Sequence, residues 1–184
     1  METMTSRQRV KNAIEHKPVD RMPIDLGIHL STGISAFAYH NLREYLGLST
    51  NNIKICDPMQ FLAKVDEDVL ERVHCDCYHL HTGYSNPAIY NPRDKYQFIT
   101  EERLLPTLNQ GGEWILKQGD KRARMPEGGF FYDGDCVSPF DNTDERDLNR
   151  LAIEAERIYK ETDYFTMFMG WGAFMGGMDF QMDM

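Results

Sequence analysis

The chain of 184 residues lacks an excess of positive charge and lacks any long hydrophobic run. Lys and Arg number 20 against 29 Asp and Glu, the formal net charge is −9, and no Lys/Arg cluster interrupts this acidic balance. We therefore expect no nucleic-acid partner and no membrane partner, because both attract a basic surface. The longest uncharged run, Tyr164 to Met178, is shorter than the roughly 18 apolar residues of a membrane span. We expect it to be a buried strand followed by a loop.

Cysteine is also scarce, with four residues at positions 56, 75, 77 and 136. Because the sequence shows no signal-peptide pattern, we expect reduced thiols in a cytoplasmic protein and no disulfide framework. No internal repeat, coiled coil or low-complexity linker divides the chain. Its length and its hydrophobic content of 41% predict a single domain with a substantial core.

The most informative stretch is residues 18–36, PVDRMPIDLGIHLSTGISA. Its two prolines exclude a helix around Asp20, since proline lacks an amide donor and biases the preceding residue toward extended backbone. From Pro23 onward the side chains alternate between an aliphatic face and a polar or small face. The second face holds Asp25, Gly27 and His29. We predict a β-strand here that ends in a loop rich in Gly, Ser and Thr.

Helices and further strands are predicted along the rest of the chain. A capping-box pattern at Thr5 and Gln8 predicts a helix to residue 16. The second helix is expected to bury Phe37, Ala38, Leu42, Tyr45 and Leu46. An Asp-Pro-x-Gln pattern at Asp57 predicts a third helix, with a restart at Asp66, and apolar periodicity predicts a fourth from residue 143 or 144 to Glu161.

Two more strands are predicted over residues 75–81 and 163–169. Alternation along the first places four residues on one face, namely Cys75, Cys77, His79 and His81. Residues 84–142 are rich in Gly, Pro, Asn and Asp, and we expect an antiparallel β insertion there, with EWILKQ and GFFYDGD among its strands. An insertion after a barrel strand would lie at the barrel mouth, as a lid or an oligomer contact.

Five segments carry a family resemblance: SRQRVKNAIEHKPVDRMPIDLGIHLSTGISAFAYHNLREYLGL, ICDPMQFLAKVDEDVLERV, CDCYHLHTG, SPFDNTDERDL and ETDYFTMFMGWGAFMGGMDF. Together they resemble the uroporphyrinogen decarboxylase (URO-D) superfamily, and most closely its corrinoid-linked methyltransferase-like branch. The resemblance implies a TIM-type (β/α)8 barrel, which typically takes about 250 residues. The expected fold is therefore α/β: residues 1–184 form one domain, the N-terminal part of such a barrel, and residues 84–142 are the β-rich insertion within it.

This resemblance implies methyl transfer between a corrinoid such as methylcobalamin and a thiol or similar acceptor, incomplete in this chain. A corrinoid or a corrinoid protein is the partner it implies. In that branch zinc is held by a His-x-Cys pair and a later Cys in the second half of the barrel, so we expect no metal ligand in these residues. Four consecutive same-face residues on a strand also span about 20 Å, which disfavours a zinc site on residues 75–81.

Two alternatives remain open. True decarboxylases carry an arginine-rich motif after the first strand and an aspartate near the end of the second. Here those places read GIHLSTGIS, without arginine, and HLHTG, with Gly83 close to the position of the aspartate. Decarboxylation of uroporphyrinogen is thus the weaker enzymatic hypothesis. The other alternative is an inactive, truncated half-barrel that pairs as a homodimer to cover its open strand edges.

The mouth of the expected barrel provides the candidate site residues. His29, His79 and His81 are the candidate catalytic residues, because histidines at the ends of neighbouring strands could exchange protons or contact a corrinoid or its methyl acceptor. The candidate cofactor contacts are Asp25, Ser31 and Trp171. The alternative for each histidine is a satisfied polar residue in a water-filled half-barrel. Trp171 and the neighbouring methionines would form either a soft floor for a flat cofactor or ordinary core.

Overall fold

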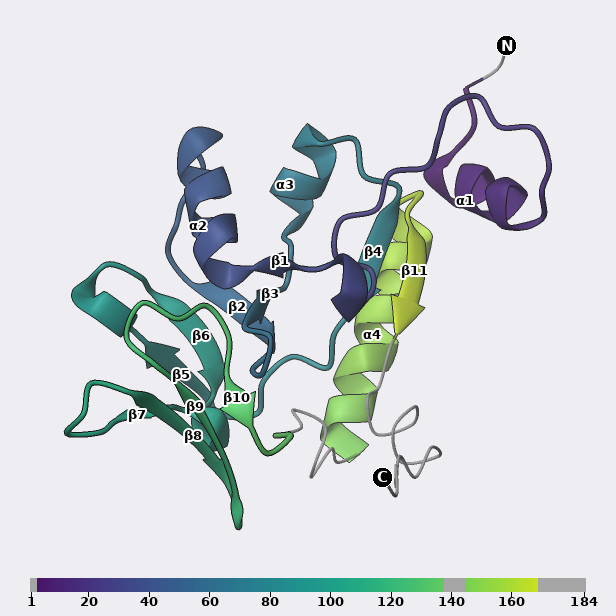
Figure 1. Cartoon of the computed structure of the whole chain (residues 1–184). Helices are drawn as coiled ribbons and strands as arrows, with labels where there is room; N and C mark the ends of the chain where they lie inside the picture. The colour runs from purple at the N-terminus through teal and green to yellow at the C-terminus, as the bar shows by residue number, and fades with distance from the viewer. Residues whose placement is uncertain (1–2, 138–144, 169–184) are drawn as a thin grey trace, which may run out of the picture.

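The computed structural model describes residues 3–137 and 145–168, and Figure 1 shows how they are arranged. Within these ranges the chain is a mixed α/β protein whose strands form separate sheets and no closed barrel. The α-helices are α1 (Ser6–Ile14), α2 (Ala36–Tyr45), α3 (Glu67–Arg72) and α4 (Glu145–Glu161). The strands are β1 (Ile34–Ser35), β2 (Ile53–Asp57), β3 (Leu62–Ala63), β4 (Cys77–Leu80), β5 (Pro87–Tyr90), β6 (Phe98–Glu101), β7 (Thr107–Leu108), β8 (Trp114–Gln118), β9 (Lys121–Met125), β10 (Asp133–Gly134) and β11 (Phe165–Phe168).

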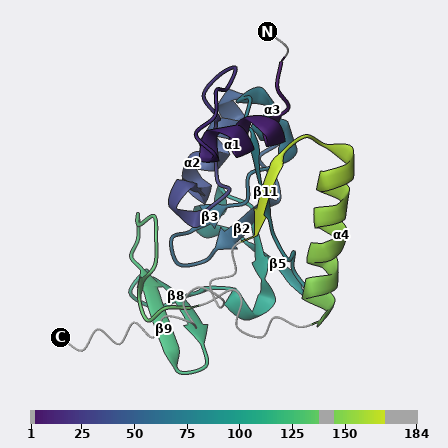
Figure 2. The same cartoon turned by 90° about the vertical axis from the view of Figure 1, so that its right-hand side faces the viewer.

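The parallel pair of β4 and β11 is the part that most resembles the expected barrel. Cys77 lies opposite Phe165 and Leu80 opposite Phe168. Parallel neighbours need a crossover connection, and α4 supplies it, running alongside both strands (Figures 1 and 2). The only fully buried side chain that α4 contributes in the described residues is Ile158. All of β4 is buried, as expected for a parallel strand covered on both faces. The partial TIM-type barrel stays a prediction.

The insertion is antiparallel, as predicted, and its second half forms a sheet in the order β10-β9-β8-β7. Its first half, β5 and β6, instead joins the sheet β1-β3-β2-β6-β5, because Ile53 of β2 pairs in parallel with Phe98 of β6. Aromatic rings fasten this sheet to α2. Phe37 meets Tyr96 and Phe98 edge-to-face, with ring centroids 4.9 and 5.5 Å apart, a favoured aromatic geometry. The insertion therefore shares a hydrophobic core with the residues before it.

The strand predicted from Pro23 is wrong, since residues 23–25 have no regular secondary structure and residues 26–29 form bends. Hydrogen bonds within a turn take the place of the strand-to-strand hydrogen bonds that a β-strand would make. The Asp25 carboxylate accepts a hydrogen bond from the Ile28 amide at 3.0 Å, and Gly27 has a left-handed φ of +84°. The His29 side chain then caps a short 3₁₀ helix, Leu30–Thr32. One main-chain hydrogen bond, from the Asp76 amide to the Ile24 carbonyl at 2.8 Å, still ties this segment to the start of β4.

The helix predicted after Asp57 is also wrong. Asp57 Oδ1 accepts hydrogen bonds from the amides of Met59 and Gln60, as a cap would, but the chain then turns through Phe61 with φ of +54°. It returns as β3, antiparallel to β2, so strand pairing overrides the local helix signal. The predicted restart at Asp66 is confirmed by α3.

The first and last helices are confirmed, although α1 ends at Ile14 and not at residue 16, and the buried face predicted for α2 is partly wrong. Thr5 and Gln8 form the capping box of α1, and α4 ends at Glu161 as predicted. In α2, Phe37 is buried, whereas Ala38 and Tyr45 are exposed. The buried polar residues of α2 are Tyr39, His40 and Arg43.

Candidate functional site

Two of the three candidate histidines meet at the carboxyl end of β4. His79 is buried, with 7% of its surface exposed, and His81 follows the strand in a half-buried position. Their ring centroids are 6.1 Å apart, and the two ring planes are nearly perpendicular. His81 Nδ1 accepts a hydrogen bond from the Gly83 amide at 2.9 Å, so the neutral ring carries its proton on Nε2. His79 Nδ1 is buried and has no hydrogen-bond partner in the described part of the chain.

Both rings are neutral at neutral pH. Burial lowers the pKa of His79 to about 4, and the positive charges of Lys64 and His29 act in the same direction. Burial also lowers the pKa of His81 to about 3, together with the charges of His79, Lys64 and Lys54. A neutral imidazole with so low a pKa is a poor general base at neutral pH, but it can still donate one hydrogen bond and accept another.

The remaining candidates from the sequence are His29, Ser31, Asp25 and Trp171, and none of them belongs to the histidine pair at the end of β4. His29 is close enough to lower the pKa of His79, but its Nδ1 accepts a hydrogen bond from the Ser31 amide at 2.9 Å. Ser31 itself is exposed. Asp25 is also exposed. Burial raises the pKa of the Cys77 thiol, and the charge of Asp25 acts in the same direction. Trp171 lies outside the described residues.

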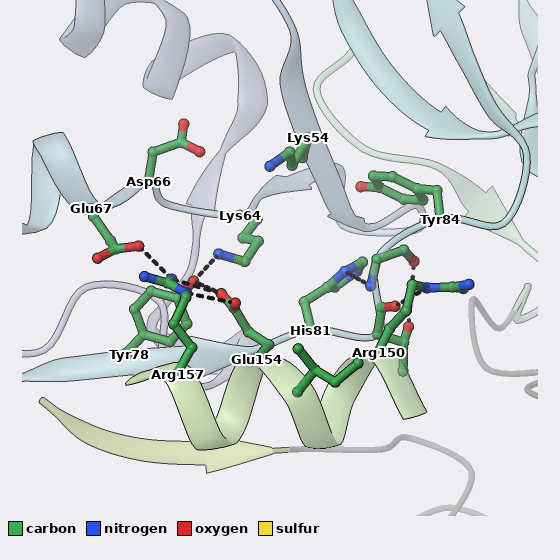
Figure 3. A pocket seen from close by; sticks show the side chains of 13 residues that line it. Lys54, Lys64, Asp66, Glu67, Tyr78, His81, Tyr84, Arg150, Glu154 and Arg157 are labelled. Carbon is green, nitrogen blue, oxygen red and sulfur yellow. Dashed lines mark hydrogen bonds and ion pairs between the residues drawn. The ribbon is translucent and has the colours of Figure 1, made fainter. Parts of the chain in front are cut away.

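A pocket of about 510 Å³ opens beside His81, between α4 and the β2–β3 hairpin (Figure 3). Most of the residues around it are polar or charged. They are Lys54, Lys64, Asp66, Glu67, Tyr78, His81, Thr82, Gly83, Tyr84, Arg150, Ile153, Glu154 and Arg157. Among them only His81 was a candidate from the sequence. The signal that could have indicated the pocket is on α4, where Arg150, Glu154 and Arg157 recur at helical spacing on one face.

One wall of the pocket is a chain of polar contacts. Lys64 Nζ donates to the Tyr78 hydroxyl at 3.0 Å, and that hydroxyl donates to Glu154 Oε1 at 2.5 Å. Arg157 binds Glu154 at 3.0 Å and Glu67 at 2.6 Å. Hydrogen bonds from Arg157 outweigh partial burial and lower the pKa of Glu154 to about 2. Burial and the facing carboxylate raise the pKa of Tyr78, so its hydroxyl keeps its proton.

Arg150 and Lys64, two further cations of the lining, have different surroundings. Arg150 is fixed, donating to the Thr82 carbonyl and the Ser85 hydroxyl at 3.0 Å each and pairing with Asp147. Burial and the charge of Lys54 lower the pKa of Lys64. In the ranges 3–137 and 145–168, no group of three or more His, Cys, Asp or Glu side chains is placed to hold a metal ion.

Comparisons with known proteins add no family assignment. No family model, no curated protein and no solved structure matches the chain. None of the helices that the structure describes has both the length and the apolar character that crossing a membrane requires.

Proposed function

We propose that the chain is a URO-D-like protein of the methyl-transfer branch, in which His29, His79 and His81 line the place where a small thiol or similar acceptor meets a methylated corrinoid. The observation that carries the proposal is the unsatisfied Nδ1 of His79. Leaving a buried polar atom without a partner costs ~1–3 kcal/mol, so such an atom calls for a functional explanation. It lies at the carboxyl end of a parallel strand, where α/β proteins bind their ligands.

The described residues do not fit a whole corrinoid. The pocket beside His81 has a volume of about 510 Å³ and a charged lining, whereas a corrinoid is larger than the drug-sized ligands that fill such pockets. We therefore assign the described residues to the acceptor, and we place the corrinoid on a partner corrinoid protein. No chemical step is assigned to the corrinoid through these residues.

The role that fits the three histidines is positioning. Since the pKa values of His79 and His81 are about 4 and about 3, neither imidazole would remove a thiol proton efficiently at neutral pH. Each can hold a hydrogen-bonding group of the acceptor in a water-poor setting, which favours reaction by orientation. We also place the protein in the cytoplasm, which suits four free cysteines, three of them buried.

Titration with methylcobalamin and a small thiol, followed by visible spectroscopy, tests the proposal. We expect the corrinoid spectrum to change as the methyl group leaves, with formation of the methylated thiol. The variant His79→Leu should lose this reaction while keeping or slightly raising the free energy of unfolding, because it removes an unsatisfied polar atom. His16→Asn is the control, since His16 is exposed and has a left-handed φ that Asn tolerates. No spectral change and no methylated thiol would refute methyl transfer.

The same preparation separates the two alternatives. Turnover of uroporphyrinogen would favour the decarboxylase. A solution mass of two chains, without binding of corrinoid or thiol, would favour a self-associating half-barrel.

A further inference from the structure

Cationic side chains outnumber carboxylates by four to three in the lining of the pocket between α4 and the β2–β3 hairpin. Each carboxylate in its lining has an arginine partner: Arg157 binds Glu67 and Glu154, while Arg43 binds Asp66 at 3.0 Å. Lys54 and Lys64 have no carboxylate within ion-pair distance in the described residues. The two ammonium groups are therefore the cations of the lining that form no ion pair in the described residues, since Arg150 pairs with Asp147 and Arg157 with both glutamates.

Both lysines point into the same space. The Lys64 amide donates to the Lys54 carbonyl at 2.8 Å, so the two residues are neighbours across the β2–β3 pairing. Figure 3 shows their side chains and the ring of His81 around one opening, with Tyr84 along another side. Burial is the main reason that the pKa values of His81 and Lys64 are lowered. The charge of Lys54 acts in the same direction on both groups, whereas Asp66, Glu154 and Glu67 act to raise the pKa of Lys64.

The rest of the lining suits an organic ligand. His81 accepts from the Gly83 amide through Nδ1, which leaves its Nε2–H as a neutral donor. The Tyr84 hydroxyl donates to the Ile55 carbonyl at 2.7 Å, and this contact fixes the aromatic ring. Ile153 on α4 is 69% exposed and adds an apolar surface to the lining. A volume of about 510 Å³ is sufficient for a small metabolite.

We propose that this pocket binds a small organic dianion, with Lys54 and Lys64 as its charge partners and the Tyr84 ring and Ile153 against its carbon skeleton. Phosphate monoesters and dicarboxylates share this chemistry. Tyr78 and Glu154 hold Lys64 in place through the Tyr78 hydroxyl. The site lies on the α4 side of β4 and shares His81, but neither His29 nor His79, with the proposed acceptor site, so failure of methyl transfer would not decide whether this pocket binds a dianion.

Calorimetric titration and ligand-dependent melting test this proposal, with inorganic phosphate and succinate as probes against sodium chloride at equal ionic strength. We expect saturable binding of at least one probe and a rise in melting temperature. Phosphate binding would assign the phosphate-ester class, and succinate binding the dicarboxylate class. Lys54→Met and Lys64→Met should each weaken binding at least about tenfold, the effect of one lost charge-assisted hydrogen bond.

Two further variants keep the test decisive. Lys117→Met removes an exposed lysine on β8, outside the pocket lining, and should bind the probes like the original chain. Lys64→Arg retains the positive charge and should retain part of the affinity for the probes. This variant still tests the charge requirement if Lys64→Met fails to fold. Absence of saturable binding by both probes would overturn the proposal. Binding that survives both Lys54→Met and Lys64→Met would overturn it as well.

Discussion

Replacing Asp76 by alanine should destabilise the protein strongly, because this carboxylate joins α1 and the segment after it to β4. Its side chain is fully buried and accepts from Arg9 at 2.5 Å, from Arg21 at 2.6 and 2.9 Å, and from the Ile24 amide at 2.8 Å. Burial opposes its ionisation, but these hydrogen bonds outweigh burial and lower its pKa. Asp76→Ala would leave the buried Arg9 guanidinium with one carboxylate fewer.

Removing one partner of a buried ion pair typically costs ~3–5 kcal/mol, a large share of the ~5–15 kcal/mol that stabilises a domain. Denaturant unfolding followed by circular dichroism measures the change as a lower midpoint at an unchanged slope. The control is Glu15→Gln, which removes an exposed partner of Lys17 and should leave the midpoint essentially unchanged. A loss of less than ~1 kcal/mol for Asp76→Ala would refute the reasoning, because the ion pairs would then add nothing beyond a surface contact.

Two further predictions concern pH and the core. The folded pKa of His79, about 4, is below the unfolded value of about 6.5, so the unfolded state binds more protons between these values. The His79 contribution should therefore lower stability by up to ~3 kcal/mol as pH decreases from about 6.5 to about 4, and His81, whose pKa is about 3, should add to this loss. In unfolding experiments across that range, His79→Leu should reduce the pH dependence without abolishing it; an unchanged slope in the variant would contradict the prediction. Phe98 is fully buried among Phe37, Phe61 and Tyr96, so Phe98→Ala should lower the free energy of unfolding by ~3–5 kcal/mol. Phe131→Ala, at a residue that is 62% exposed, should lower it far less. Equal losses of stability in thermal unfolding would count against the shared core.

Elements whose signals are local and repeated could be predicted from the sequence. The Thr5–Gln8 capping box defines α1, and the apolar periodicity of α4 was sufficient to place it before β11. The prediction of a strand at residues 23–29 was wrong because Asp25 and Gly27 favour a turn, which the alternation of apolar and polar residues does not indicate. The helix after Asp57 failed because pairing with β2 is a long-range contribution that no local window contains.

The candidate site likewise contains residues that the sequence predicts and residues that it does not. The alternation of side chains along one strand predicted that His79 and His81 lie on the same face, and the two rings are indeed neighbours. The pocket lining was missed because Lys54, Lys64, Tyr78 and Glu154 come from different elements that only the folded chain brings together. Neither the unpaired Nδ1 of His79 nor the lack of an ion pair at Lys54 and Lys64 can be recognised before the positions of their neighbours are known.

The most direct test of the central claim is the nitrogen NMR spectrum of the histidine rings during titration with methylcobalamin and a small thiol. If His79 contacts the acceptor, its Nδ1 resonance should move saturably with thiol concentration while that of His16 stays fixed. A His79 resonance that does not respond, in a sample where the thiol is methylated, would contradict the site proposed here.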